Sequence, residues 1–257
     1  MNRITEIIKN YLNKYNFKIE HVNSWYERNE HRIAEISNDE LKILKEINKF
    51  SMSTPANHWA IIQSIKHIKK NHIEGDLAEC GVWRGGNLIL FKQMLKKYDL
   101  KKKIFAFDTF EGMPEPSKKD FDLKDVEAEK IYKKYKMKDI KWCYSSIEEV
   151  KTNIDNFFKD NNEGLEFIKG KVEETLMDDK NLPQTISLLR LDTDFYESTK
   201  KELEILYPKL SQGGVLIIDD YGHWKGSKKA VDEYFNLEND FEWFHRIDYA
   251  SRLYIKK

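Results

Sequence analysis

The hydrophobic and polar positions along the chain follow two different periods. Up to about residue 72, apolar residues recur every three or four positions, as in "ITEIIKNYL", "DELKILKEINKF" and "ANHWAIIQSIKHIKK". This spacing is typical of amphipathic helices, and Asn38 or Asp39 is positioned to cap the second of them. We therefore predict a helical N-terminal extension over residues 1–72.

From Asp76 onward, short apolar runs alternate with charged stretches of helical period. Candidate strands cover residues 76–82, 103–110, 165–172, 186–194 and 214–221, followed by "EWFHRID" and "RLYIKK". Candidate helices cover residues 87–98, 147–159, 197–210 and 226–236. This alternation predicts an α/β domain over residues 73–257 with a mostly parallel, doubly wound, seven-stranded sheet. No helical stretch separates the last two strands, so they should form an antiparallel hairpin at one edge.

One segment of this domain does not fit the alternation. Residues 111–142 form a long, charged stretch with prolines near its start. Unstructured connections of this length are uncommon in compact domains and usually serve a function. We predict a lid or insertion above the sheet.

Composition narrows the class of protein only slightly. The 257 residues include 44 Lys+Arg and 44 Asp+Glu, so a net charge of zero gives no reason to expect nucleic acid or an anionic membrane as partner. The sequence shows neither a signal peptide nor an apolar run of the ~20 residues that span a membrane. Two cysteines in a chain of this length suit a reducing cytosol. A cytoplasmic location is expected, and the abundant Lys, Asn and Ile hint at an AT-rich bacterial genome.

The stretch "GDLAECGVWRGGN" follows the first strand with a glycine cluster that is either a plain turn or a ligand site. Glycine lets a backbone turn tightly and approach a ligand, but Gly81 and Gly85 do not form the GxGxxG pattern. Asp108 ends the next strand, where a carboxylate typically accepts hydrogen bonds from a ribose. These residues favour an adenosine-containing ligand. Glu79 would repel a pyrophosphate and suits the cationic end of S-adenosylmethionine (SAM).

Carboxylates also end two later strands. Asp192 and Asp194 lie two positions apart, so an extended chain would point them the same way, and Asp219 with Asp220 ends the following strand. If the strands are neighbours, three or four carboxylates gather within a small volume, which suits Mg²⁺ or Ca²⁺. The alternative is a set of separate salt bridges and helix caps, with Asp194 capping the helix near Glu197.

Three residues near these motifs allow two interpretations each. His223 and Trp224, in "DDYGHWKG", form either a packed aromatic loop or a wall of an acceptor pocket. Met52, in the polar loop "SMSTP", taken by itself suggests core packing.

The motifs together resemble the TylF/MycF/NovP family, the macrocin-type sugar O-methyltransferases. The resemblance rests on "GDLAECGVWRGGN", "FDTFEGMPEP", "GKVEETL" and "RLDTDFYESTKKELEILYPKLSQGGVLIIDDYGHWKGSKKAVDEYF", which span roughly residues 50–236. It implies a class I, Rossmann-like methyltransferase fold, SAM as methyl donor, S-adenosylhomocysteine (SAH) as product, Mg²⁺ as an essential metal, and a homodimer or larger homo-oligomer.

The resemblance also implies roles for individual residues. Glu79 and Gly81 would lie along the methionine end of SAM, Asp108 would hold the ribose, and Glu173 would lie near the adenine. The full expected sets are Glu79, Gly81, Gly85, Asn87, Asp108, Thr109 and Glu173 for SAM; Asp192, Asp219 and Asp220 for the metal; Met52, Ser53, Tyr196, His223 and Trp224 for the acceptor. Asp194 matches the general base, with the division of roles between it and Asp192 open.

The expected reaction is methyl transfer to a sugar hydroxyl, oriented and made more acidic by the metal and deprotonated by Asp194. The lysine-rich 111–142 segment departs from the antibiotic-tailoring members, so we expect a free or nucleotide-linked sugar of a bacterial capsule or other surface glycan. The alternatives are a macrolide or aminocoumarin sugar, a catechol, and, outside the methyltransferases, a non-catalytic binding protein or an NAD-dependent oxidoreductase.

Overall fold

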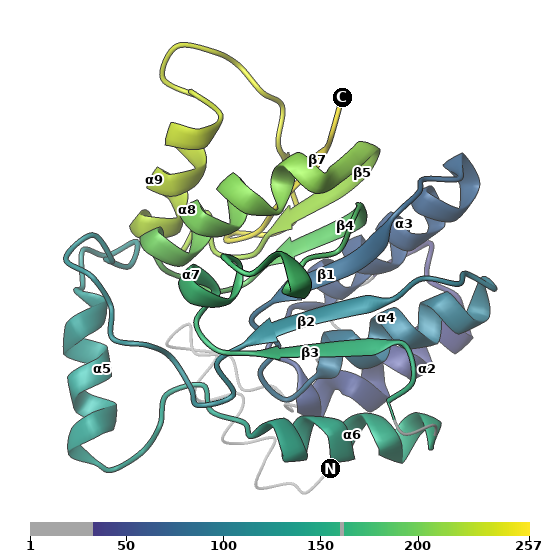
Figure 1. The fold of residues 1–257 in the computed structure, drawn as a ribbon, viewed down its shortest axis with the longest axis horizontal. Helices are drawn as coiled ribbons and strands as arrows, with labels where there is room; N and C mark the ends of the chain where they lie inside the picture. The colour runs from purple at the N-terminus through teal and green to yellow at the C-terminus, as the bar shows by residue number, and fades with distance from the viewer. Residues whose placement is uncertain (1–32, 160–161) are drawn as a thin grey trace, which may run out of the picture. The chain divides into compact units, whose positions relative to one another are not determined.

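The computed structural model describes residues 33–159 and 162–257 of the chain (Figure 1). The helix expected in "ITEIIKNYL" lies outside the described residues. The larger compact unit is Ser37–Lys257, so the unit begins well before the expected domain boundary at residues 72 and 73. Among the described helices, none is both long and apolar enough to cross a membrane.

A seven-stranded sheet forms the centre of the described chain, in the order β3-β2-β1-β4-β5-β7-β6. Its strands are β1 (Asp76–Cys80), β2 (Ile104–Asp108), β3 (Leu165–Lys169), β4 (Ile186–Leu191), β5 (Leu210–Ile218), β6 (His245–Arg246) and β7 (Arg252–Ile255). Strands β1 to β5 pair in parallel, while β7 pairs antiparallel with both β5 and β6. The predicted parallel sheet with an antiparallel hairpin at one edge is confirmed.

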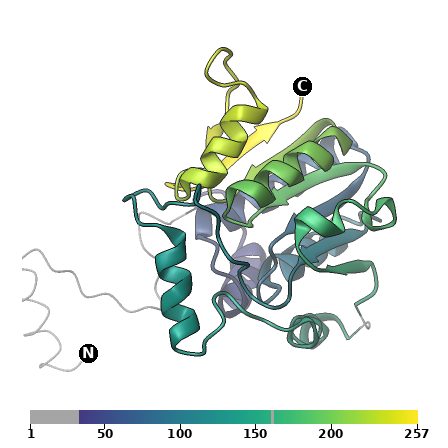
Figure 2. The same ribbon diagram turned by 60° about the vertical axis from the view of Figure 1, so that its left-hand side comes forward.

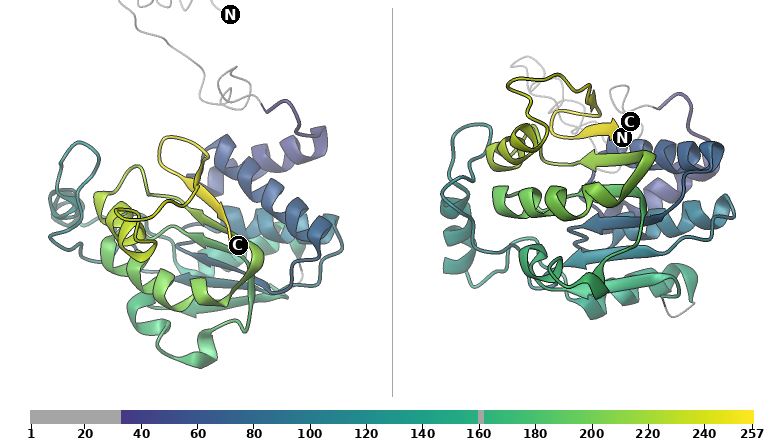
Figure 3. Two further views of the ribbon diagram at one scale, coloured as in Figure 1. Left: turned by 90° about the horizontal axis from the view of Figure 1, so that it is seen from above. Right: turned by 45° about the horizontal axis from the view of Figure 1, so that its top comes forward.

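Helices cover both faces of the sheet (Figures 1 and 3). The described α-helices are α2 (Asn38–Ile47), α3 (Pro55–Asn71), α4 (Gly86–Lys97), α5 (Ala128–Met137), α6 (Ile147–Phe158), α7 (Val172–Thr175), α8 (Tyr196–Ile205) and α9 (Lys225–Tyr234), and all but α5 cover the sheet. Helices α2, α3, α4 and α6 lie on one face, and α7, α8 and α9 lie on the other. Local sequence explains their starts: Ser37 and Glu40 form a capping box for α2, and Thr54 caps α3 just before a proline.

Several element ends differ from the prediction for local reasons. The predicted strand 165–172 stops at Lys169, because Gly170 adopts a φ of +140° and the chain turns into α7. The predicted helix 197–210 ends at Ile205, before Pro208, and residues from Leu210 join β5. Of "EWFHRID", only His245 and Arg246 are in a strand.

The central strands are buried on both faces, which explains their continuous apolar runs. Every residue of β4 is buried, and Leu77, Ala78, Glu79 and Cys80 of β1 are buried as well. Two of these buried residues, Glu79 and Arg190, are charged. Buried charges need partners, so the middle of the sheet must contain a polar network.

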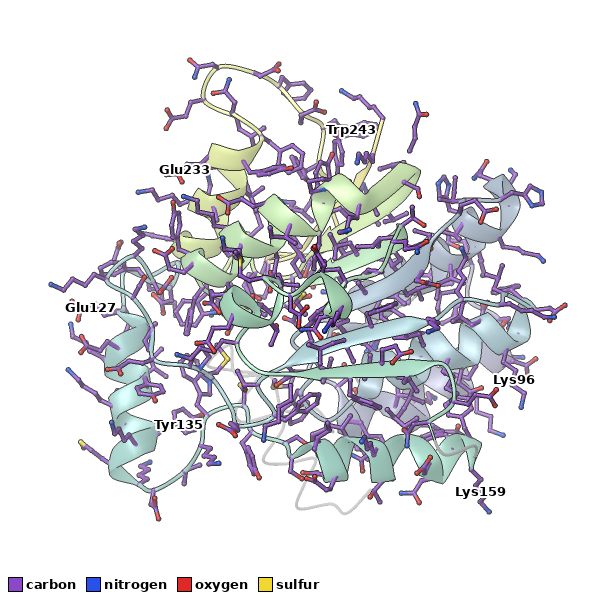
Figure 4. All side chains as sticks on the ribbon, in the orientation of Figure 1. Lys96, Glu127, Tyr135, Lys159, Glu233 and Trp243 are labelled. Atoms are coloured by element: carbon purple, nitrogen blue, oxygen red, sulfur yellow. The ribbon has the colours of Figure 1, made fainter. Side chains whose placement is uncertain are left out.

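The 111–142 segment leaves the body of the domain and returns to it. Its helix α5 stands beyond the carboxyl ends of the strands, as Figures 1 and 2 show, and Figure 4 labels Tyr135 on it and Glu127 just before it. Asp120 fastens the outgoing arm, since its carboxylate accepts hydrogen bonds from the backbone amides of Ser117 (2.7 Å) and Tyr196 (2.8 Å). The returning arm is held by Trp142, which packs on other aromatic rings described below. Whether the segment acts as a lid stays a prediction.

The first glycine of "GVWRGG" brings two strand ends into direct contact. Gly81 has a φ of +83°, and a Cβ built there would lie 1.9 Å from the backbone oxygen of Asp192. Gly164 has nearly the same φ, +80°, but a Cβ there would meet nothing within 4 Å. A side chain at Gly164 would meet only the cost of a left-handed backbone, whereas a side chain at Gly81 would also clash with the Asp192 backbone.

We predict that Gly164→Ala lowers the free energy of unfolding by about 1 kcal/mol, the cost of the backbone conformation alone. Gly81→Ala should cost about 3 kcal/mol or more, because it adds a clash with backbone. Denaturant unfolding of both variants measures this difference. Equal losses would show that the contact between Gly81 and Asp192 is not tight.

Candidate functional site

Two adjoining cavities open at the carboxyl ends of the central strands. The first has an empty volume of about 710 Å³ and the second of about 760 Å³, both including space open to solvent. Residues that line both are Met52, Gly81, Trp83, Cys143, Asp192 and Asp194. The cavities therefore form one continuous space, at the edge where ligands of open α/β sheets bind.

The glycine turn forms the floor of the first cavity. Gly81 donates its amide to the carbonyl of Phe107 (2.8 Å), and Gly85 takes a left-handed conformation at the start of α4. Asp108 closes the turn: its Oδ2 accepts from the amides of Val82 (2.7 Å) and Trp83 (3.3 Å). Burial raises the pKa of Asp108, while these backbone hydrogen bonds oppose that rise. Asp108 thus fixes the shape of the loop as well as facing the cavity.

The first cavity brings together most of the residues expected around SAM. Gly81, Asp108, Thr109 and Glu173 line it, whereas Asn87 lines the second cavity. Glu79 lines neither: it is buried and its Oε1 accepts hydrogen bonds from Asn87 (3.0 Å) and Arg190 (2.9 Å). Burial raises the pKa of Glu79 to about 7, against the opposing charge of Arg190.

The strand-end aspartates lie in the second cavity. Asp192, Asp194 and Asp220 each offer a carboxylate oxygen, and these oxygens all lie within 4.8 Å of one another. The route differs from the prediction, because β4 already ends at Leu191 and Asp194 reaches the cluster through a left-handed turn with φ of 67°. Asp194 is not a helix cap; the N-cap of α8 is Phe195.

The fourth aspartate, Asp219, lines the same cavity but faces a different set of partners. Its Oδ1 accepts hydrogen bonds from Asn57 (2.7 Å), Arg190 (2.8 Å) and Ser251 (3.1 Å). Asp219 therefore connects the cluster to the buried network behind it.

Burial gives this cluster unusual protonation properties. Desolvation is the largest cause that raises the pKa of Asp192 to about 6 and that of Asp194 to about 7, and repulsion between the carboxylates adds to it. The pKa of Asp220 rises well above its usual range for the same reasons. Asp220 Oδ2 is buried without a hydrogen-bond partner. An orphaned carboxylate oxygen beside two others is the donor set of a hard divalent cation.

Of the five residues predicted to contact the acceptor, four line the second cavity and Tyr196 does not. Met52, Ser53, His223 and Trp224 line the second cavity. Met52 is 59% exposed, so the core-packing interpretation was wrong. Tyr196 lies elsewhere: its hydroxyl donates to Glu233 (2.6 Å), and its ring lies against Lys119. It lines neither cavity, and its placement between α8 and α9 is that of a packing residue.

An aromatic cluster joins the lid to the site. The ring centroids of Trp142, Phe195 and Trp224 lie 5.6 to 6.0 Å apart, and the three rings meet edge-on or tilted. Trp142 belongs to the lid, Phe195 precedes α8 and Trp224 precedes α9. The packed aromatic interpretation of His223 and Trp224 is thus supported, and both residues also line the second cavity; whether that cavity takes the acceptor stays a prediction.

Sequence reasoning missed several residues of the site, and four of them are informative. Trp83 and Cys143 line both cavities, and Trp142 lines the second; each lies in a loop whose path the sequence does not reveal. Arg190 carried a visible signal, because a charged residue inside the apolar run "ISLLRL" must be paired when the strand is buried. Arg190 is fully buried between Glu79, Asp192 and Asp219.

This strand order, with the glycine turn after β1 and acidic strand ends, defines a class I SAM-dependent methyltransferase. The chain belongs to the macrocin-O-methyltransferase (TylF) family, whose model matches residues 49–256. It is accordingly an SAM-dependent O-methyltransferase, as the resemblance predicted.

Individual relatives support the assignment. The chain is 32% identical over 74% of its length to demethyldecarbamoylnovobiocin O-methyltransferase of Streptomyces niveus, covering 72% of that protein. It is 30% identical over 66% of its length to a (2,3-dimethoxy-α-L-rhamnosyl)-tetracenomycin-C 4′-O-methyltransferase of Streptomyces olivaceus, covering 61% of it. The solved structure of the O-methyltransferase NovP matches with a TM-score of 0.68 and 31% identity, over 80% of this chain and 82% of that one.

The buried carboxylates predict how stability depends on pH without metal. Burial raises the pKa of Asp194 and Asp219 to about 7 and that of Glu202 to about 8, so the folded chain keeps protons that the unfolded chain loses near pH 4. Stability should therefore fall by roughly 1–2 kcal/mol from pH 7 to 8.5. His58, whose pKa burial lowers to about 3, is mostly neutral in both states over this window.

Thermal unfolding at several pH values, with EDTA or Mg²⁺, tests this expectation. Mg²⁺ should stabilise the protein more at pH 8.5 than at pH 7, because binding requires the deprotonated carboxylates. Asp220→Asn should weaken both the pH dependence and the effect of Mg²⁺. Stability that stays flat or increases with pH in EDTA would contradict the raised pKa values.

Proposed function

We propose that this chain transfers the methyl group of SAM to a sugar hydroxyl in a Mg²⁺-dependent reaction. The observation that carries the proposal is the cluster of Asp192, Asp194 and Asp220, with its orphaned oxygen, in a space continuous with the glycine-turn cavity. The position suits a donor on one side and an acceptor on the other, with the carboxylates between them.

Residues of the first cavity would hold SAM. The glycine turn would let the ligand approach the backbone closely, and Asp108, with Thr109 next to it in the lining, would hold the ribose. Glu173, in α7, would lie near the adenine. Asn87 reaches the adjoining cavity from the first turn of α4, and Glu79 contributes from behind, through its hydrogen bond to Asn87.

The carboxylates Asp192, Asp219 and Asp220 would hold Mg²⁺. Asp220 would offer its unpartnered Oδ2, with Asp192 beside it in the cluster. Asp219 is not among the three clustered carboxylates, and because its Oδ1 already accepts three hydrogen bonds it would take part through Oδ2. When bound, the cation would supply a Lewis acid that lowers the pKa of an acceptor hydroxyl.

Asp194 would take the proton from that hydroxyl. Its carboxylate lies in the cluster at the boundary of the two cavities, and burial raises its pKa to about 7, close to the value of an efficient base at neutral pH. The left-handed backbone of Asp194 is a conformation that non-glycine residues seldom adopt, and such strain often accompanies function. The deprotonated oxygen then accepts the methyl group, and SAH is released.

The relatives favour a natural-product sugar as acceptor. The Streptomyces olivaceus enzyme is named for methylation of a rhamnosyl group, and the Streptomyces niveus enzyme for a novobiocin precursor. They give no support to the capsule or surface-glycan sugar expected from the lysine-rich lid. The aromatic wall of Trp142, His223 and Trp224 offers apolar faces for a sugar ring. A homo-oligomer remains an expectation that light scattering can test.

The role of Asp194 is tested by Asp194→Asn. We expect turnover to fall about 10²- to 10⁴-fold, because the amide cannot accept the proton, while SAH and Mg²⁺ affinities stay close to wild type. Calorimetric titrations and a methyl-transfer assay measure the three quantities. Asp178→Asn, at an exposed turn outside both cavities, is the matched control. Unchanged turnover would remove Asp194 as base, and loss of Mg²⁺ binding would make it a ligand instead.

The acceptor class is tested with a panel of compounds and labelled SAM. We expect methylation of rhamnosyl-type glycosides, no turnover in EDTA, and recovery when Mg²⁺ is added back. Faster methylation of catechols would favour the phenol alternative, and exclusive use of nucleotide-linked sugars would place the reaction before glycosyl transfer. Full activity in EDTA would disprove the metal's role.

A further inference from the structure

The buried network behind the aspartates converges on one guanidinium group, that of Arg190. Arg190 Nη1 donates to Asp192 Oδ2 (2.6 Å) and Glu79 Oε1 (2.9 Å). Arg190 Nη2 donates to Asp219 Oδ1 (2.8 Å) and Ser53 Oγ (3.2 Å). Two of the expected metal ligands are thus bound to two nitrogens of the same group.

We propose that Arg190 is a positioning residue of the metal site, an inference that rests on the proposed Mg²⁺-dependent function. It occupies one oxygen of Asp192 and one of Asp219, and so leaves the other oxygen of each carboxylate for the cation. The residue does not touch the reacting atoms itself, because it lies within the sheet and lines neither cavity.

The negative charge of the carboxylates explains why a positively charged side chain, that of Arg190, lies behind them. Glu79 is buried and Asp192, Asp194, Asp219 and Asp220 are partly buried around it, and like charges this close repel one another. Arg190 offsets part of this charge from the protein side. It can therefore keep the carboxylates assembled before a metal ion arrives.

Geometry explains why arginine suits this position. The planar guanidinium presents its donors in a fixed fork, so Nη1 and Nη2 can each hold a different carboxylate at a set separation. A lysine at the same place has one nitrogen on a flexible stem. It would keep a positive charge and lose the second arm of the fork.

Further contacts fix the guanidinium itself. Asn87 Nδ2 donates to Glu79 Oε1 (3.0 Å) and to Ser53 Oγ (3.2 Å), and both of these atoms also accept from Arg190. The "SMSTP" loop and the start of α4 are thereby connected to Asp192 and Asp219. Besides its expected place along SAM, Glu79 therefore also holds the Arg190 guanidinium in position through its hydrogen bond to Nη1.

The experiment compares Arg190→Lys with wild-type protein in the absence of SAM. Mn²⁺ binding followed by electron paramagnetic resonance, and Mg²⁺ by competition, should show affinity reduced about 10- to 100-fold, the usual effect of losing a group that orients metal ligands. SAH affinity should change less than about threefold, and turnover should recover in part at high Mg²⁺. Leu189→Ala, the neighbouring core residue on the opposite face of β4, should lower stability and leave metal affinity unchanged.

The possible results separate the positioning role of Arg190 from the Mg²⁺-dependent function on which it rests. Metal affinity in Arg190→Lys equal to wild type, or SAH affinity lost in parallel with metal affinity, would overturn the positioning role alone. Failure of the wild-type protein to bind Mn²⁺ would remove the metal-dependent function together with it.

If Arg190→Lys does not fold, Glu79→Gln tests the same arrangement with the guanidinium in place. The substitution replaces the ion pair between Glu79 and Arg190 with a weaker hydrogen bond and removes one negative charge near the metal site, so Mg²⁺ affinity should fall severalfold. Unchanged affinity in Glu79→Gln would overturn the inference.

Discussion

The charge of Arg190 inside the sheet is the constraint on which the site depends. A guanidinium that is fully buried must be paired, and the partners available to it are the acidic ends of β1, β4 and β5. Removing one member of such a group leaves an uncompensated buried charge, which typically costs about 3–5 kcal/mol. The fold therefore keeps these carboxylates together even though they repel one another. A site that collects negative charge this closely is ready for a cation from the solvent side.

The order of the strands brings the paired residues to one edge of the sheet, together with the glycine turn. Strands β1 and β4 are neighbours, and β5 follows β4, so the glycine turn and both aspartate pairs open at the same edge. The 111–142 segment is joined to this edge through the contact of Trp142 with Phe195 and Trp224. The glycine turn, the carboxylates and the aromatic wall thus come from segments far apart in sequence that meet because parallel strands end together.

Much of this could be predicted from sequence, because the signals were local. Apolar runs separated by helical stretches predicted the parallel sheet, and polar residues at strand ends predicted that Asp108, Asp192 and Asp220 lie at the cavity edge of the sheet, where they are found. The directions of side chains could not be predicted in the same way. Glu79 was expected beside the ligand and is buried against Arg190, since the alternation along β1 depends on register with β4. Tyr196 was placed near the acceptor by the motif around it, whereas its helix turns it toward Glu233.

The contact between Gly81 and Asp192 has a consequence for how such enzymes can change. The turn at Gly81 and the turn after β4 at Asp192 touch through backbone atoms, without a side chain between them to absorb a displacement. An insertion or a shift in one turn must therefore move the other. In this family, new acceptors should arise through the lid and the loops before α3 and α9, while the two turns are inherited as one unit. A chimaeric enzyme that exchanges only one of them would combine two halves that no longer fit.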